Sequence, residues 1–165
     1  MRKTFALLLL LAGCNRTDPA PDQGNGPAPV ASESSRDSSA PRAAAGGLTG
    51  LYEGGAGAQK NQLCLVEKGR ETEFGLIVWG GNLHSCSGAG VAVRSGERLS
   101  LRMTGDETCT IEATLKDGKV TLPATLPTGC AYYCGARASL AGATFERSGD
   151  DVKKATDIAG DPLCD

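Results

Sequence analysis

The sequence predicts an all-β domain, a small antiparallel meander that closes as a barrel or folds as a sandwich, with a short C-terminal helix. Apolar and polar residues alternate in several short runs, as in strands that bury one face. Turn residues such as Gly and Asp-Gly separate these runs roughly every ten residues, which is typical of hairpins. Six cysteines in the same region indicate that disulfide bonds staple the sheet.

The folded region is expected to begin at residue 49, where alternation appears and proline becomes rare. The clearest alternation predicts that one face of two neighbouring strands is buried, formed by Leu99, Leu101, Met103, Ile111, Ala113 and Leu115. The expected strands are 50–53, 62–67, 73–79, 90–94, 98–104, 108–115, 119–122 and 139–146.

The C-terminal region has a different pattern, which predicts a short helix over 150–159 that docks on the sheet. Acidic residues at 150 and 151 suit the positive end of a helix dipole. Gly160 and Pro162 would end the helix. One side of the helix would carry Val152, Ala155, Ile158 and Ala159.

The chain opens with two basic residues and a leucine-rich run that is too short to span a bilayer. Residues 11–14 read Leu-Ala-Gly-Cys, which resembles the lipobox of bacterial lipoproteins. The resemblance implies a signal peptide over 1–13, a diacylglycerol on the sulfur of Cys14, and acylation of the new amino terminus by a fatty acid such as palmitate. Such acyl chains anchor a protein lastingly to a membrane. Because Asn15 rather than Asp follows the cysteine, the family pattern favours the outer membrane.

Residues 14–48 are predicted to form a lipidated, disordered tether. Five of the eight prolines lie in this segment, and Val30 and Leu48 are its only large aliphatic residues. It therefore cannot bury enough apolar surface to offset the entropy of ordering. Residues 49–165 would then be displayed in the periplasm as the β domain.

The cysteines other than Cys14 are expected to form three disulfides, because an exported chain enters an oxidising compartment. They are Cys64, Cys86, Cys109, Cys130, Cys134 and Cys164. If a hairpin centres near Gly96, Cys86 falls opposite roughly residue 106. We therefore expect a Cys86–Cys109 bond and leave the other two pairings open.

Zinc is the alternative use of these cysteines, since Cys86, Cys130, Cys134 and the only histidine, His84, could supply four ligands. The Cys130-Ala-Tyr-Tyr-Cys134 spacing differs from the two-residue spacing of most zinc knuckles. We expect disulfides, and neither a metal nor a cofactor.

No hydrolase or phosphate-binding motif is present in the sequence. A Ser-His-Asp set would have to use the only histidine, His84, with Asp106 across the hairpin, and adjacency in sequence does not bring three such groups together. We therefore expect no catalytic residues and no enzyme. The net charge of −2 lacks the basic surplus of nucleic-acid-binding proteins.

Aromatic residues indicate a binding surface instead. Trp79 ends a strand beside Gly80 and Gly81. Tyr132 and Tyr133 cannot both enter one core if their segment is extended, so one ring is expected to point outward between two bridged cysteines. Such aromatics often anchor interfaces. The expected function is non-enzymatic binding of an envelope protein or glycan, with the oligomeric state left open.

The expected architecture is also similar to that of the membrane-bound inhibitors of c-type lysozyme, which are small disulfide-containing β-barrels on a lipid anchor. Their inhibitory loop contains a Ser-Gly-x-x-Tyr motif. Residues 87–91 here read Ser-Gly-Ala-Gly-Val, so Val91 stands where the motif has Tyr. The resemblance implies an alternative function, inhibition of a lytic enzyme, but transfers no site residue.

Overall fold

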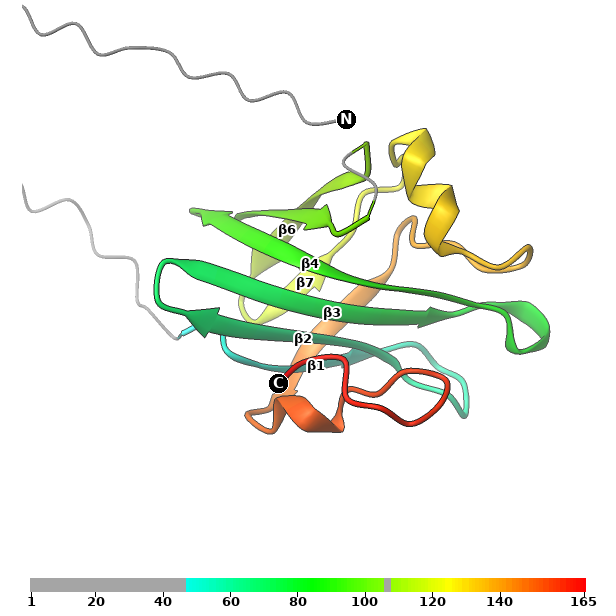
Figure 1. The fold of residues 1–165 in the computed structure, drawn as a ribbon, viewed down its shortest axis with the longest axis horizontal. Coiled ribbons are helices and arrows are strands. Elements are labelled where there is room, and N and C mark those ends of the chain that lie inside the picture. Colours follow the sequence, from blue (N-terminus) through cyan, green and yellow to red (C-terminus); the bar gives the residue numbers. More distant parts are fainter. Residues whose placement is uncertain (1–46, 106–107) are drawn as a thin grey trace, which may run out of the picture. The chain divides into compact units, whose positions relative to one another are not determined.

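The computed structural model describes residues 47–105 and 108–165, and within them eight antiparallel strands form a closed barrel in which each strand pairs with its neighbours in sequence (Figure 1). The all-β prediction is therefore confirmed, with the barrel as the form adopted. The strands are β1 (Gly50–Gly54), β2 (Asn61–Lys68), β3 (Glu71–Trp79), β4 (Ser85–Ser95), β5 (Arg98–Met103), β6 (Thr110–Lys116), β7 (Lys119–Thr121) and β8 (Thr144–Gly149). Single 3₁₀ segments occur at η1 (Gly81–Leu83), η2 (Thr128–Tyr133) and η3 (Val152–Lys154). Cys14 and the tether up to residue 46 lie outside the described residues.

The barrel interior is filled by one face of each strand, as the alternation predicts. In the β5–β6 ladder Leu99 pairs with Ala113 and Leu101 with Ile111, and all four side chains are buried. Phe74 and Phe145 provide the largest fully buried side chains. Because the core contains few aromatic residues, it depends on close packing of aliphatic side chains.

Two strands start five residues away from the predicted position. β4 begins at Ser85 rather than 90, because its first half pairs with β3 as far as the Trp79–Ser85 pair. The prediction missed this half because it is rich in Gly and Ser and has no apolar alternation. β8 begins at Thr144 rather than 139, because the preceding residues form a turn in which the Ala143 N–H donates to the Leu140 carbonyl at 3.2 Å.

The C-terminal helix is limited to η3, and the predicted extent of 150–159 is wrong. After Lys154 the backbone is held by other partners: the Leu163 N–H donates to the Ala155 carbonyl at 2.8 Å, and the Gln62 side chain accepts from the Thr156 N–H at 3.1 Å. Ile158, expected on the buried side of a helix, is 74% exposed.

This C-terminal segment packs on the outer face of β1 and β2, beside which it runs in Figure 1. A Cys64–Cys164 disulfide fixes its end, and Ala155 is fully buried against the sheet. Its approach to β3 requires a glycine, because a Cβ on Gly75 would lie 2.5 Å from the Leu163 carbonyl oxygen. The barrel therefore has a second, smaller apolar cluster outside its wall, formed by Leu51, Cys64, Ala155 and Cys164.

β7 is the shortest strand of the barrel. It contributes three residue pairs to β6 and three to β8, whereas β3 and β4 share eight. The two ladders of β7 are thus, together with the three-pair β1–β8 ladder, the shortest of the barrel.

Candidate interaction surface at the long-loop end

The two ends of the barrel differ in how the strands are connected. At one end, here called the tight-turn end, two-residue turns at 69–70, 96–97 and 117–118 join consecutive strands. At the opposite end, the long-loop end, the connections run over 55–60, 80–84, 104–109 and 122–143. Binding residues tend to lie on loops held by a rigid scaffold, so the long-loop end is the first place to look for a site.

The chain enters the barrel at the tight-turn end. Leu48 is 5% exposed; its N–H donates to Glu67 Oε2 at 3.0 Å, and its carbonyl accepts from the Tyr52 hydroxyl at 2.9 Å. The Arg147 guanidinium lies 5.8 Å from the Tyr52 ring centre and donates to the Gly47 carbonyl at 3.3 Å. Leu48 is therefore part of the domain, and the predicted boundary at residue 49 is too late.

Two ion pairs at this end involve Arg147 and Lys68. A hydrogen bond to Asp150 raises the pKa of Arg147, and one to Glu73, at 2.7 Å, raises the pKa of Lys68. Both cations thus stay charged at neutral pH. Because these pairs are exposed to solvent, they contribute little to stability, and their partners leave them little unmatched charge for a ligand.

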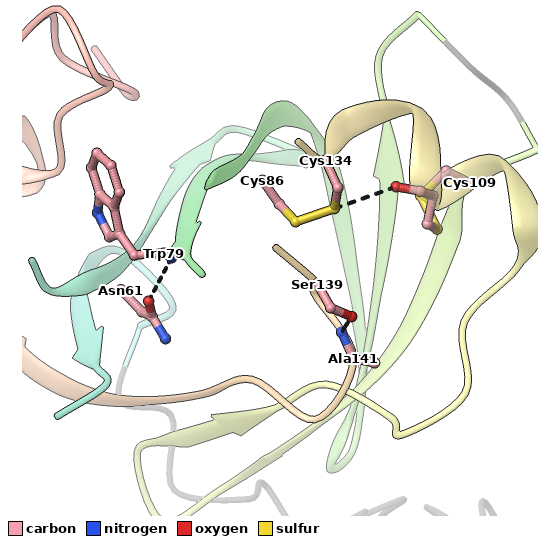
Figure 2. The surroundings of a disulfide bond; sticks show 8 residues. Asn61, Trp79, Cys86, Cys109, Cys134, Ser139 and Ala141 are labelled. Carbon is pink, nitrogen blue, oxygen red and sulfur yellow. Dashed lines mark hydrogen bonds between the residues drawn. A yellow bond between two sulfur atoms is a disulfide. The ribbon is translucent and has the colours of Figure 1, made fainter. Parts of the chain in front are cut away.

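The long-loop end is organised by two neighbouring disulfides. Cys130 is bonded to Cys109, just before β6, and Cys134 to Cys86 in β4 (Figure 2). The predicted Cys86–Cys109 bond is wrong. The hairpin register on which it depended is correct as far as the Gly90–Met103 pair, but β5 ends there. An isolated bridge to Cys134 then takes the position opposite Cys86.

The disulfides also bear on the zinc alternative. The sulfurs of Cys86, Cys130 and Cys134 are each bonded to another sulfur, so none is a thiolate ligand in this structure. Within residues 47–105 and 108–165, no group of three His, Cys, Asp or Glu side chains is arranged to hold a metal ion.

Tyr132 and Tyr133 lie between the two disulfides, in η2. Tyr132 is 78% exposed, whereas Tyr133 is half-buried against the core and its hydroxyl donates to the Thr104 carbonyl at 2.9 Å. The two rings meet edge to face with centres 5.3 Å apart. One ring therefore points outward because successive residues of a 3₁₀ turn face different directions, and not because the segment is extended.

Trp79 does not join the tyrosine pair. It ends β3, is half-buried, and its backbone N–H donates to Asn61 Oδ1 at 2.9 Å. In Figure 2 its indole points away from the disulfide between Cys86 and Cys134. Of the three aromatics singled out from the sequence, the structure brings together only the two tyrosines.

Leu83, in the loop between β3 and β4, is a residue that the sequence analysis missed. Asn82 and Leu83 have φ angles of 55° and 60°, in the left-handed region. Asn tolerates this region, but for a residue such as Leu it costs about 1–2 kcal/mol. Leu83 is also 70% exposed. Such backbone strain is typical of functional sites, and nothing in Gly-Gly-Asn-Leu-His marks the leucine for it.

The loop that carries Leu83 is fixed to the segment after η2. The Gly81 N–H donates to the Arg137 carbonyl at 3.0 Å, and the Gly80 N–H to the His84 carbonyl at 2.7 Å. A Cβ on Gly80 would lie 2.1 Å from the Arg137 carbonyl oxygen, so only glycine permits this approach. His84 is half-buried beside Gly135. Its suggested partner Asp106 lies outside the described residues.

A small apolar pocket lies on the other side of η2. Its volume is about 230 Å³, and mostly apolar atoms line it. Two of its walls, Cys130 and Leu140, belong to the barrel core and are 2% and 1% exposed. The lining residues are Leu126, Pro127, Thr128, Cys130, Ala131, Cys134, Ala138, Ser139, Leu140 and Ala141.

The connection that forms this pocket is almost uncharged, since Arg137 is the only ionisable side chain other than cysteine and tyrosine between residues 122 and 143. Depletion of charge combined with exposed aromatic rings is the composition of interface centres. In the part of the chain that the structure describes, no helix is long and apolar enough to cross a membrane. Comparison of the chain with protein-family models, curated proteins and solved structures gives no match.

Proposed function

We propose that this chain is a lipid-anchored protein of the bacterial envelope whose barrel binds a partner, without catalysis, through the long-loop end. The lipobox-like residues 11–14 and the expected acylation of Cys14 support the anchor. The binding part of the proposal rests on the exposed ring of Tyr132, which lies between two disulfide-bonded cysteines, Cys130 and Cys134.

The physical argument concerns the cost of ordering. A flexible aromatic side chain loses conformational entropy when a partner covers it, and that loss reduces the affinity. Here the backbone of η2 is held by Cys109–Cys130 and Cys86–Cys134, and Tyr133 supports the ring of Tyr132 from the side. Rigid tyrosines with little entropy left to lose are frequent anchors of binding surfaces.

The position of the chain entry also supports this site. Leu48 and Gly47 are bound at the tight-turn end. The described chain therefore starts at the end of the barrel opposite to Tyr132 and Leu83.

Site-specific photo-crosslinking of the full chain in its native envelope tests the proposal. A benzophenone-bearing amino acid replaces Tyr132 or Leu83, and in control chains it replaces Val93 or Ile158, which are 63% and 74% exposed. We expect one discrete crosslinked species from the first two positions and none from the controls. Equal crosslinking from all four positions, or none from any, would contradict binding at this end. Fatty-acid labelling that persists in Cys14→Ser would contradict the anchor.

Inhibition of a lytic enzyme is a second candidate, because a closed, disulfide-linked barrel is the architecture that the resemblance to lysozyme inhibitors implies. However, residues 87–91 lie inside β4 and pair with β3, where Gly88 is opposite Leu76, so they do not form a loop. The assay is lysis of cell walls by lysozyme in the presence of the full chain. No slowing at micromolar concentration would remove this candidate.

A further inference from the structure

The apolar pocket beside η2 suggests which kind of partner the surface fits. We infer that it accepts one apolar side chain from an uncharged segment of another protein, with Tyr132 packing on the same segment. This inference rests on the proposed function and adds the chemistry of the partner to it. It depends on the size, the rigidity and the charge of the pocket.

The size of the pocket suits a side chain better than a small molecule. Its volume is about 230 Å³, whereas pockets for cofactors and drug-sized ligands typically have about 300–1,000 Å³. Residues three apart in a 3₁₀ turn lie on one face, so Thr128 and Ala131 of η2 both face the pocket, which they line. Tyr132, next in sequence to Ala131, is exposed to solvent.

The pocket is also formed before any partner arrives. Disulfides hold Cys134 in its wall to Cys86 in β4 and Cys130 to Cys109 just before β6, and Leu140 in its wall is part of the barrel core. Disulfides and core packing therefore hold these three walls in place. A preformed pocket avoids the cost of ordering on binding.

The polar groups of the pocket select against charged and sugar ligands. Ser139 Oγ already accepts the Ala141 N–H at 3.1 Å (Figure 2), and Arg137 is the one Lys, Arg, Asp or Glu of the connection. A basic segment would lose its hydration here without gaining an opposite charge, and an acidic one would meet only Arg137, which does not line the pocket. The hydroxyls of a glycan would find only two side-chain hydroxyls in the lining, those of Thr128 and Ser139, as hydrogen-bond partners. An apolar peptide side chain meets neither penalty.

The test uses a phage-displayed library of random twelve-residue peptides, selected on the full chain held in detergent micelles. We expect the selected peptides to share one Leu, Ile, Met or Phe flanked by uncharged residues. Two substitutions should fill the pocket, Ala131→Leu and Ala141→Leu. Each should weaken binding of a selected peptide by about ten- to a hundred-fold, the range for losing the burial of one such side chain.

Ala136→Leu provides the matched control, because Ala136 is exposed on the same connection but does not line the pocket. It should leave the affinity unchanged. The inference fails if no peptide is selected, if selected peptides are rich in charge, or if the pocket-filling variants bind like the control. It also fails if sedimentation shows a dimer of the full chain that Ala131→Leu dissociates, since a second copy then occupies the pocket. A partner that crosslinks at Tyr132 in wild type and equally in a chain that also carries Ala131→Leu refutes this inference alone and leaves the proposed function standing.

Discussion

Cys134 and Cys86 are bonded across the long-loop end with their Cα atoms 3.9 Å apart, although they are 48 residues apart in sequence. Four residues before Cys134, Cys130 is bonded to Cys109. The short η2 segment is thereby attached to β4 and to the start of β6. This arrangement gives Tyr132 a fixed position on a connection that would otherwise be a long loop.

Removal of the disulfides one at a time should destabilise the barrel in a definite order. Replacing both cysteines of Cys64–Cys164 by Ala should cost about 4–5 kcal/mol, because this bond closes the longest stretch of chain in the unfolded state, with a sequence separation of 100. The same change at Cys109–Cys130, with a separation of 21, should cost about 3 kcal/mol. Guanidinium unfolding of the full chain measures both. The reverse order would contradict this explanation.

Leu83→Gly should stabilise the protein by up to about 1 kcal/mol, because glycine adopts the left-handed region without the strain of leucine. The gain is limited, since glycine also increases the entropy of the unfolded chain. Asn82→Gly is the control and should change stability less, because asparagine tolerates this region. We expect Leu83→Gly to weaken crosslinking from position 132 while it raises Tm. A lower Tm would show that Leu83 is there for stability.

Gly80→Ala should destabilise the barrel by about 1–3 kcal/mol, the usual cost of forcing an extra carbon into a packed site. The new Cβ would lie 2.1 Å from the Arg137 carbonyl oxygen, so the loop that carries Leu83 must move. Gly149→Ala is the matched control, since its Cβ would have no atom within 4 Å. Thermal unfolding of both variants gives the comparison. Equal effects would mean that the contact between the two loops does not matter.

Leu48→Ala should cost about 2–4 kcal/mol, as expected for a buried leucine whose removal leaves a cavity. Leu83→Ala, at a position that is 70% exposed, should cost much less. Urea unfolding of the full chain distinguishes them. If Leu48→Ala is neutral, the domain does not begin where its contacts with Glu67 and Tyr52 place it.

The strands that alternation predicted best are those whose two faces differ most in environment. Leu101 in β5 and Ile111 in β6 face the core, whereas the residues on either side of each are more exposed. Period-two patterning therefore identifies both strands. The first half of β4 escaped prediction because Gly88 and Gly90 lie where neighbouring side-chain and backbone atoms leave no room for a Cβ, and glycine carries no pattern. Packing space, unlike hydrophobicity, is not visible along one sequence.

The candidate site could be predicted only in part for the same reason. An outward tyrosine between two bonded cysteines followed from local spacing. The partners of those cysteines did not, because Cys86 and Cys134 meet only where β5 ends and a distant segment replaces it. Leu83 lies in a loop whose Gly81 N–H donates to the Arg137 carbonyl, a contact between distant residues that is equally invisible in the sequence. Leu48 was assigned to the tether because its neighbours in sequence are those of a linker.

The short pairing of β7 has a further consequence for this surface. Amide protons along β7 should exchange with solvent sooner than those of β3, because local opening begins where the fewest contacts must break. The connection with Tyr132 follows β7 directly, and it would open together with β7 if β7 were its only attachment. Its two disulfides instead attach it to β4 and to Cys109 just before β6, so the position of Tyr132 does not depend on the short ladders of β7 alone.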